Sequence, residues 1–106
     1  MQPSKITILG DFFDCQIYRG RLYLWTLSGD IYTYDWNGII DSLETDPIDK
    51  IPLTFCFKDG RYLYKSSLIE LFKDSEFRDL LKKKFQRIQS RKYILRINEL
   101  NKFLIG

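Results

Sequence analysis

Histidine is missing from this sequence of 106 residues. Because histidine is the base of Ser-His and Cys-His nucleophile pairs, those pairs are excluded. The sequence also has no Walker A loop and no GxGxxG motif, the two common phosphate-binding loops. These absences predict a protein that is not an enzyme, with no catalytic residue and no cofactor.

Cysteine is scarce, with Cys15 and Cys56 as its two representatives. Their separation excludes a CxxC pair, so a zinc or redox site has no ligand set and no metal is expected. Each cysteine stands inside an apolar, strand-like run. We therefore expect two buried, reduced thiols.

Long hydrophobic runs are also missing. A membrane-spanning helix needs roughly 18 apolar residues, and no run approaches that length. The first residues, "MQPSKITILGDFF", have no apolar signal core followed by a small-residue cleavage site. The sequence thus indicates a cytoplasmic protein without a membrane partner.

Aromatic residues, in contrast, are abundant. They make up 16% of the chain, whereas the hydrophobic share of 44% and the charged share of 29% are ordinary for a globular protein. The length suits one small domain. We expect a single α+β domain over residues 1–106, β-rich over 1–64 and mainly helical over 65–106.

Charge is divided between the two parts of the chain. Residues 1–60 carry five Lys/Arg and nine Asp/Glu, whereas residues 61–106 carry twelve Lys/Arg and five Asp/Glu. Two explanations are open: the halves attract each other, or the basic half meets an acidic partner.

The β-rich part contains strand-like runs separated by glycine turns. Turns at Arg19-Gly20 and Ser28-Gly29 predict two-residue hairpin loops. Asp59-Gly60 predicts another hairpin, and "TDPIDKIP" (45–52) is expected to be a connector. The expected sheet is a four-stranded antiparallel meander over 5–9, 12–18, 21–27 and 30–36, with a second hairpin over 53–57 and 61–64.

The hydrophobic period changes after Tyr64. A capping box, Ser67-x-x-Glu70, predicts a helix over 67–73. The main amphipathic helix is expected at about 76–90, because its apolar residues recur at helical spacing. A strand over 91–97 and a short terminal helix, or a frayed end, follow. The apolar residues on one face of the main helix are Phe77, Leu80, Leu81, Phe85 and Ile88.

Two-residue turns would fix the strand register and therefore the composition of each sheet face. The expected pairs are Cys15 with Leu24, Ile17 with Leu22, and Trp25 with Tyr32. One face is then aliphatic and the other aromatic. The aromatic face either packs as core or binds a partner protein. Binding is an option because Tyr and Trp combine a large apolar area with a polar O–H or N–H group, as interface residues commonly do. The candidate partner-binding residues are Tyr18, Tyr23, Trp25, Tyr32 and Tyr34.

Two segments resemble hairpins of β-propeller (WD-repeat-like) proteins: "YRGRLYLWTLSGDIYTYDWNG" and "TFCFKDGRYLYKSS". Gly20 and Gly60 are separated by about one blade repeat. The resemblance implies a scaffold for protein binding, without catalytic residues. The chain has room for two blades at most, whereas a closed propeller needs at least four. It is therefore either a propeller fragment or a small α+β domain with propeller-like hairpins, and we favour the α+β domain.

A basic patch lies in and after the main helix. A solvated helix face explains such a run most simply, and the alternative is a nucleic-acid-binding module that contacts phosphates through the basic helix 76–92. The main hypothesis is a non-catalytic protein-binding module of the adaptor, inhibitor or immunity type, whose partner is another protein or a second copy of the chain. The candidate basic-patch residues are Arg78, Lys82, Lys83, Arg87 and Arg91.

Overall fold

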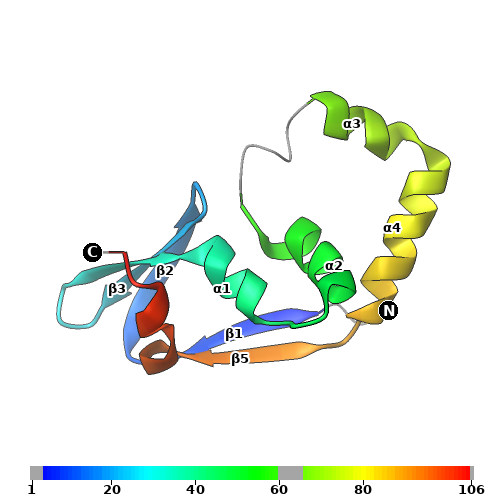
Figure 1. Ribbon diagram of the computed structural model, residues 1–106. Coiled ribbons are helices and arrows are strands. Elements are labelled where there is room, and N and C mark those ends of the chain that lie inside the picture. The colour runs from blue at the N-terminus through cyan, green and yellow to red at the C-terminus, as the bar shows by residue number, and fades with distance from the viewer. Residues whose placement is uncertain (1–3, 60–65, 106) are drawn as a thin grey trace.

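The computed structural model describes residues 4–59 and 66–105 and shows a small α+β fold. Its extents are 50 × 29 × 22 Å, so the molecule is elongated. A three-stranded sheet lies at one end and three helices lie at the other (Figure 1). A two-stranded parallel ribbon runs along one side between these ends, with one short helix above it.

The sheet is an antiparallel meander of β2 (Phe12–Tyr18), β3 (Arg21–Thr26) and β4 (Ile31–Asp35). The turn between β2 and β3 contains two residues, both with positive φ (Arg19 52° and Gly20 76°), as a type I′ turn requires. The predicted pairs Cys15–Leu24 and Ile17–Leu22 are confirmed.

The first predicted strand, β1 (Lys5–Leu9), has the expected bounds, but its place in the meander was predicted wrongly. It pairs in parallel with β5 (Lys92–Arg96), and Lys5 stands opposite Lys92. The meander therefore has three strands rather than four. Adjacency in sequence favoured a hairpin with β2, whereas the observed partner is a strand at the far end of the chain.

Two short helices follow the meander, and the second of them replaces both the predicted connector and the first arm of the second hairpin. Helix α1 (Trp36–Ser42) is capped by Asp35, whose carboxylate accepts a hydrogen bond from the Gly38 N–H at 3.1 Å. Helix α2 (Pro47–Phe57) is capped by the side chain of Asp46. Residues 53–57 are thus helical, which corrects the hairpin prediction, and its second arm at 61–64 lies outside the described residues.

The C-terminal helices follow the predictions closely. Helix α3 (Ser66–Lys73) and helix α4 (Ser75–Arg87) lie near the expected bounds, and the Asp74 carboxylate caps α4 by accepting a hydrogen bond from the Phe77 N–H at 3.0 Å. The predicted terminal helix is the 3-10 helix η2 (Ile97–Phe103). Among the described residues, no helix combines the length and the apolar character needed to cross a bilayer.

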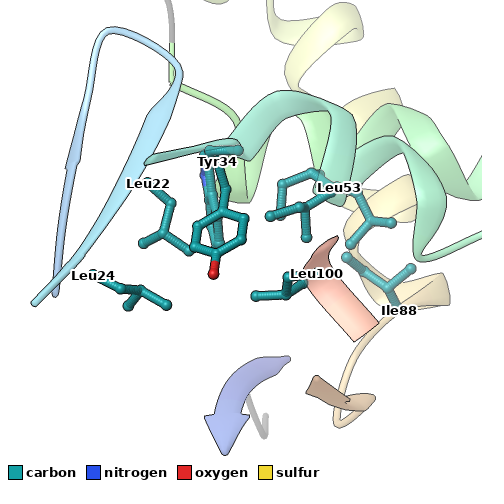
Figure 2. Packing of buried hydrophobic residues seen from close by; sticks show 9 residues of the cluster. Leu22, Leu24, Tyr34, Leu53, Ile88 and Leu100 are labelled. Carbon is teal, nitrogen blue, oxygen red and sulfur yellow. The ribbon is translucent and has the colours of Figure 1, made fainter. Parts of the chain in front are cut away.

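The core joins the meander to the helices (Figure 2). Leu22 and Leu24 of β3 face α1, α2 and η2, and Leu53 and Ile88 extend the cluster toward the helical end. Burying one such aliphatic side chain is worth about 1.5–3 kcal/mol. The fully or nearly buried members are Leu22, Leu24, Tyr34, Trp36, Ile39, Ile40, Leu53, Ile88 and Leu100.

Polar contacts attach the β2–β3 turn to the end of α2. The Gly20 N–H donates to the Asp59 carboxylate at 3.0 Å, and the Gly20 carbonyl accepts from the Trp36 N–H at 3.0 Å. The Asn37 side chain forms two hydrogen bonds with the backbone of Asp59, at 2.7 and 3.0 Å. Asp59, predicted to form a hairpin turn, instead holds the neighbouring hairpin in place.

Candidate functional site

The outer face of the meander, opposite the core, gathers several of the predicted aromatic residues. Side chains alternate between the faces of a strand, so Tyr23 and Trp25 point away from the face that carries Leu22 and Leu24. A depression of about 530 Å³ lies on this side. The residues that line it, called the outer face below, are Gln16, Tyr18, Tyr23, Trp25, Ile31 and Thr33.

The outer face is accessible to solvent. Tyr18 is 51% exposed and Ile31 is 54% exposed. Tyr23 and Trp25 are half-buried, and neither belongs to the buried cluster or to the residues packed against it. Their ring centroids lie 6.4 Å apart at an interplanar angle of 40°, within the range of an aromatic pair. The outer face therefore presents a pair of neighbouring aromatic rings to solvent.

Two predicted members, Tyr32 and Tyr34, lie on the opposite face. The expected pair of Trp25 with Tyr32 is wrong, because Trp25 stands opposite Ile31. The turn has three residues, 27–29: the Gly29 N–H bonds to the Thr26 carbonyl, and Thr26 N–H bonds to Asp30. This extra residue shifts β4 by one position and exchanges its two faces.

The core-facing tyrosines have different environments. Tyr34 is 2% exposed and packs with Leu22, whereas Tyr32 stays 43% exposed. Burial raises the pKa of the Tyr34 hydroxyl, with a smaller contribution from Tyr32. Both tyrosines line a second depression of about 550 Å³ between β4 and the β1–β5 ribbon. The five predicted aromatic residues are thus divided between the two faces.

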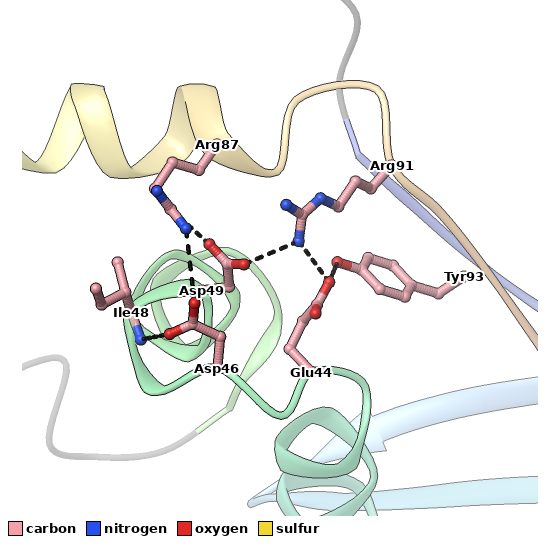
Figure 3. A network of polar contacts seen from close by, with 7 residues as sticks. All are labelled: Glu44, Asp46, Ile48, Asp49, Arg87, Arg91 and Tyr93. Carbon is pink, nitrogen blue, oxygen red and sulfur yellow. Dashed lines mark hydrogen bonds and ion pairs between the residues drawn. The ribbon is translucent and has the colours of Figure 1, made fainter.

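The predicted basic patch is also divided. Arg78, Lys82 and Lys83 are exposed on α4, as a solvated helix face requires. Arg87 and Arg91 instead bind acidic residues of the N-terminal half (Figure 3). The divided charge of the sequence is therefore explained in part by attraction within the molecule.

Asp49 is the centre of this acidic network. It is 6% exposed, and it accepts hydrogen bonds from Arg87 Nε at 2.7 Å and from Arg91 at 3.3 Å. Arg91 also donates to Glu44, and the Tyr93 hydroxyl donates to the same Glu44 oxygen at 2.8 Å. The network joins the start of α2 to the segment between α4 and β5 (Figure 3).

Each partner shifts the protonation of its neighbours. The hydrogen bond from Arg87 holds the pKa of Asp49 below its ordinary value, against the opposing effect of burial. Burial raises the pKa of Tyr93 to about 12, with a further contribution from its hydrogen bond to Glu44. The pKa of Arg91 is raised, first by its interaction with Tyr93 and then by the carboxylates. These groups form one connected network of ion pairs and hydrogen bonds.

The cysteines differ from expectation. Cys15 and Cys56 are both exposed and free, rather than buried. Cys15 lies on the edge strand β2, opposite Leu24, and Cys56 lies on α2. Within residues 4–59 and 66–105, no three acidic or cysteine side chains gather in a group able to hold a metal ion.

Sequence reasoning also missed an apolar groove among the helices. Its volume is about 290 Å³, and it lies between α2, α3 and α4. The helical signal was present, since Asp46-Pro47 is a typical helix start. Reading residues 53–57 as a strand concealed it. The residues that line the groove are Ile51, Phe55, Leu71, Phe77, Leu80, Leu81 and Lys84.

Comparisons with protein families, with curated proteins and with solved structures return no match for this chain.

Proposed function

We propose that this chain is a non-catalytic protein-binding module that binds another protein through the outer face. The observation that supports this most strongly is the position of Tyr18, Tyr23 and Trp25. They share the side of the meander that is turned away from the core. Aromatic side chains with a polar atom dominate the energetics of protein interfaces. Adaptor, inhibitor and immunity-type proteins work in this way, by occupying a surface of the partner.

The alternative of nucleic-acid binding has less support. Two of the five predicted basic residues, Arg87 and Arg91, already bind Asp49 and Glu44. The exposed lysines, Lys82 and Lys83, lie on α4, at the other end of the molecule from the meander (Figure 1). Single-stranded nucleic acids favour a surface on which aromatic rings and cations alternate. The aromatic outer face and the exposed lysines of α4 lie apart, so they do not form such a surface.

The test begins with capture of the partner. The intact chain is immobilised, exposed to an extract of the source cell, and the bound protein is identified by mass spectrometry and then purified. Calorimetry compares the parent chain with Trp25→Ala. We expect a loss of about 2 kcal/mol or more in binding, roughly 30-fold in Kd. The matched control is Ile94→Ala on β5, which removes a side chain that is 61% exposed elsewhere.

Thermal melting of Trp25→Ala provides the second measurement. Because Trp25 lies outside the buried cluster, the variant should keep its fold. A melting temperature lowered by more than about 10 °C would correspond to core-like destabilisation in a domain of this size and would contradict the proposal. Equal partner affinity in Trp25→Ala and the parent would contradict it as well.

A further inference from the structure

The two edges of the meander are not equivalent. The edge of β4 is covered by the C-terminal residues, since the Ile105 N–H donates to the Thr33 carbonyl at 2.8 Å and Leu104 forms a bridge with Tyr34. β2 is the other edge, and among the described residues its neighbour in the sheet is β3 alone. The sheet therefore has one covered edge and one open edge.

The turn geometry shows which backbone groups face the open edge. In a two-residue hairpin the residues that flank the turn form a hydrogen-bonded pair, here Tyr18 and Arg21. Gln16 and Asp14 then also bond to β3, whereas Cys15 and Ile17 direct their N–H and C=O groups outward. In agreement, the Cys15 N–H donates to the Asp14 carboxylate at 2.8 Å.

β2 has one feature that protects such an edge, a bulge at Phe13, where its register against β3 shifts between Phe12 and Asp14. From Asp14 to Tyr18 the strand is regular, and it contains neither lysine nor proline, the residues that commonly block an open edge. This strand has seven residues, "FFDCQIY", and Asp14 is its single charged residue. Six of the seven are exposed, and among them Phe13 is 64% and Ile17 is 43% exposed. An exposed apolar edge of this length favours pairing with another strand.

We propose that the open edges of two copies pair antiparallel, around a two-fold axis at Cys15, to give one continuous six-stranded sheet. The occupant is a second copy because the strand is complementary to itself in this register. Asp14 stands opposite the partner's Gln16, which can donate to its carboxylate. Phe13 and the partner's Ile17 lie at the end of the paired segment, where the bulge in β2 interrupts the regular alternation of side chains. The Asp14–Gln16 pair occurs twice, as two-fold symmetry requires.

Neighbouring registers are worse. An axis at position 14 places two Asp14 carboxylates opposite each other, and like charges directly opposite are destabilising. An axis at position 16 places Phe13 opposite the partner's Arg19, which lies in the turn. The axis at Cys15 is the register of these three that pairs the Asp14 carboxylate with the Gln16 amide.

The pairing also changes which hydrogen bond the Asp14 carboxylate accepts. In the single chain its carboxylate accepts from the Cys15 N–H. In the pair, the partner's Cys15 carbonyl accepts from this N–H, and the carboxylate becomes free for the partner's Gln16. The inference does not depend on the proposed function, because it rests on the open backbone edge of β2, although Gln16 also lines the outer face. If the proposed function and this pairing are both right, the outer faces of the two copies lie side by side on one sheet.

The first test replaces the Gln16 side chain by a cation in one variant and by an anion in another. Gln16 is exposed, so both substitutions should leave the fold intact. Gln16→Lys creates two pairs of opposite charge with Asp14, and Gln16→Glu creates two repulsive pairs. Sedimentation across a concentration series should show the dimer Kd lowered by roughly 2- to 30-fold in Gln16→Lys and raised by a similar factor in Gln16→Glu. The double variant Asp14→Lys with Gln16→Glu should restore dimerisation.

The second test uses Cys15 in a Cys56→Ser background. Residues that form a hydrogen-bonded pair have Cα atoms about 5.5 Å apart, which lies within the range that a disulfide spans. Mild oxidation should therefore produce a dimer linked through Cys15, and prior dilution should prevent it.

Three results would overturn the inference. One is a monomer at all concentrations up to about 1 mM, the weak end of specific association. Another is a dimer whose Kd is the same in Gln16→Lys and Gln16→Glu. The third is a dimer that Cys15 does not cross-link. A monomer that still binds a partner through Trp25 would overturn this inference and leave the proposed function standing.

Discussion

The Asp59 carboxylate accepts a hydrogen bond from the Gly20 N–H at 3.0 Å, which joins the end of α2 to the tip of the β2–β3 hairpin. The hairpin turn is thereby attached to the helical end of the molecule. The orientation of the outer face follows from this contact, because the outer face lies on the strands that the turn connects.

Removal of the Asp59 side chain should loosen this attachment. We expect Asp59→Ala to lower the free energy of unfolding by about 1–2 kcal/mol, since a backbone N–H loses a charged acceptor. Asp59→Asn keeps an acceptor oxygen and should lose less. Urea denaturation measures both, and equal losses in the two variants would show that the hydrogen bond to Gly20 is not the cause.

Two glycines with positive φ should respond differently to alanine. Gly20 (φ 76°) and Gly29 (φ 90°) both lie where a Cβ is strained. A Cβ on Gly20 would also lie 2.9 Å from Asn37 Nδ2, whereas a Cβ on Gly29 meets nothing within 4 Å. Both variants should lose about 1 kcal/mol for the backbone strain. Thermal melting should show the larger loss in Gly20→Ala, and the opposite order would contradict the described turn.

Acid should weaken the network around Asp49. The folded-state pKa of Asp49 is lowered, first by its hydrogen bond from Arg87, so its contribution to stability is present above the ordinary aspartate pKa. That contribution disappears as the pH falls through the folded-state pKa. Asp49→Asn should be less stable at neutral pH and should lose less on acidification. Asp11→Asn, at an exposed position, is the control and should follow the parent.

Alkali should weaken the same network through Tyr93. Its pKa is raised to about 12, so the contribution of the neutral hydroxyl is complete below the ordinary tyrosine pKa near 10 and is lost as the pH rises toward 12. Tyr93→Phe should flatten this part of the stability curve. Tyr34, whose pKa is also raised, accounts for a remaining slope. Denaturant titrations at successive pH values measure both, and an unchanged slope in Tyr93→Phe would be contrary evidence.

The two tryptophans should differ in fluorescence. Trp36 is 4% exposed and its Nε1–H donates to the Phe57 carbonyl at 2.7 Å, whereas Trp25 is half-buried on the outer face. Trp36→Phe leaves Trp25 as the emitter, and Trp25→Phe leaves Trp36. Acrylamide should quench the first variant strongly and the second weakly. Equal quenching would place Trp25 in the core instead.

The comparison of sequence with structure separates local signals from distant ones. Helix α4 and the β2–β3 register were predicted because capping, helical spacing and the Arg19-Gly20 turn act within a few residues. The register of β4 was wrong because Ser28-Gly29 fits a two-residue and a three-residue turn equally well. That single difference moved Tyr34 from the expected site into the core.

Other errors had different causes. Residues 53–57 have side chains that favour strands. They are helical nevertheless, because the helix that starts after Asp46 continues through them and buries Leu53 in the core. Arg87 and Arg91 were read as free cations because a sequence does not show that Asp49 and Glu44 lie beside them. The pairing of β1 with β5 could not be predicted from local patterns at all.

This last pairing has a consequence for the order of folding events. The hydrogen bonds of helices α3 and α4 and of the β2–β3 hairpin join residues that are close in sequence. These elements can therefore form as soon as they are synthesised. β1 has to wait for residues 92–96, and almost the whole chain lies in the loop that their pairing closes. On a ribosome, the ribbon along the side of the molecule would therefore be completed only near the end of synthesis.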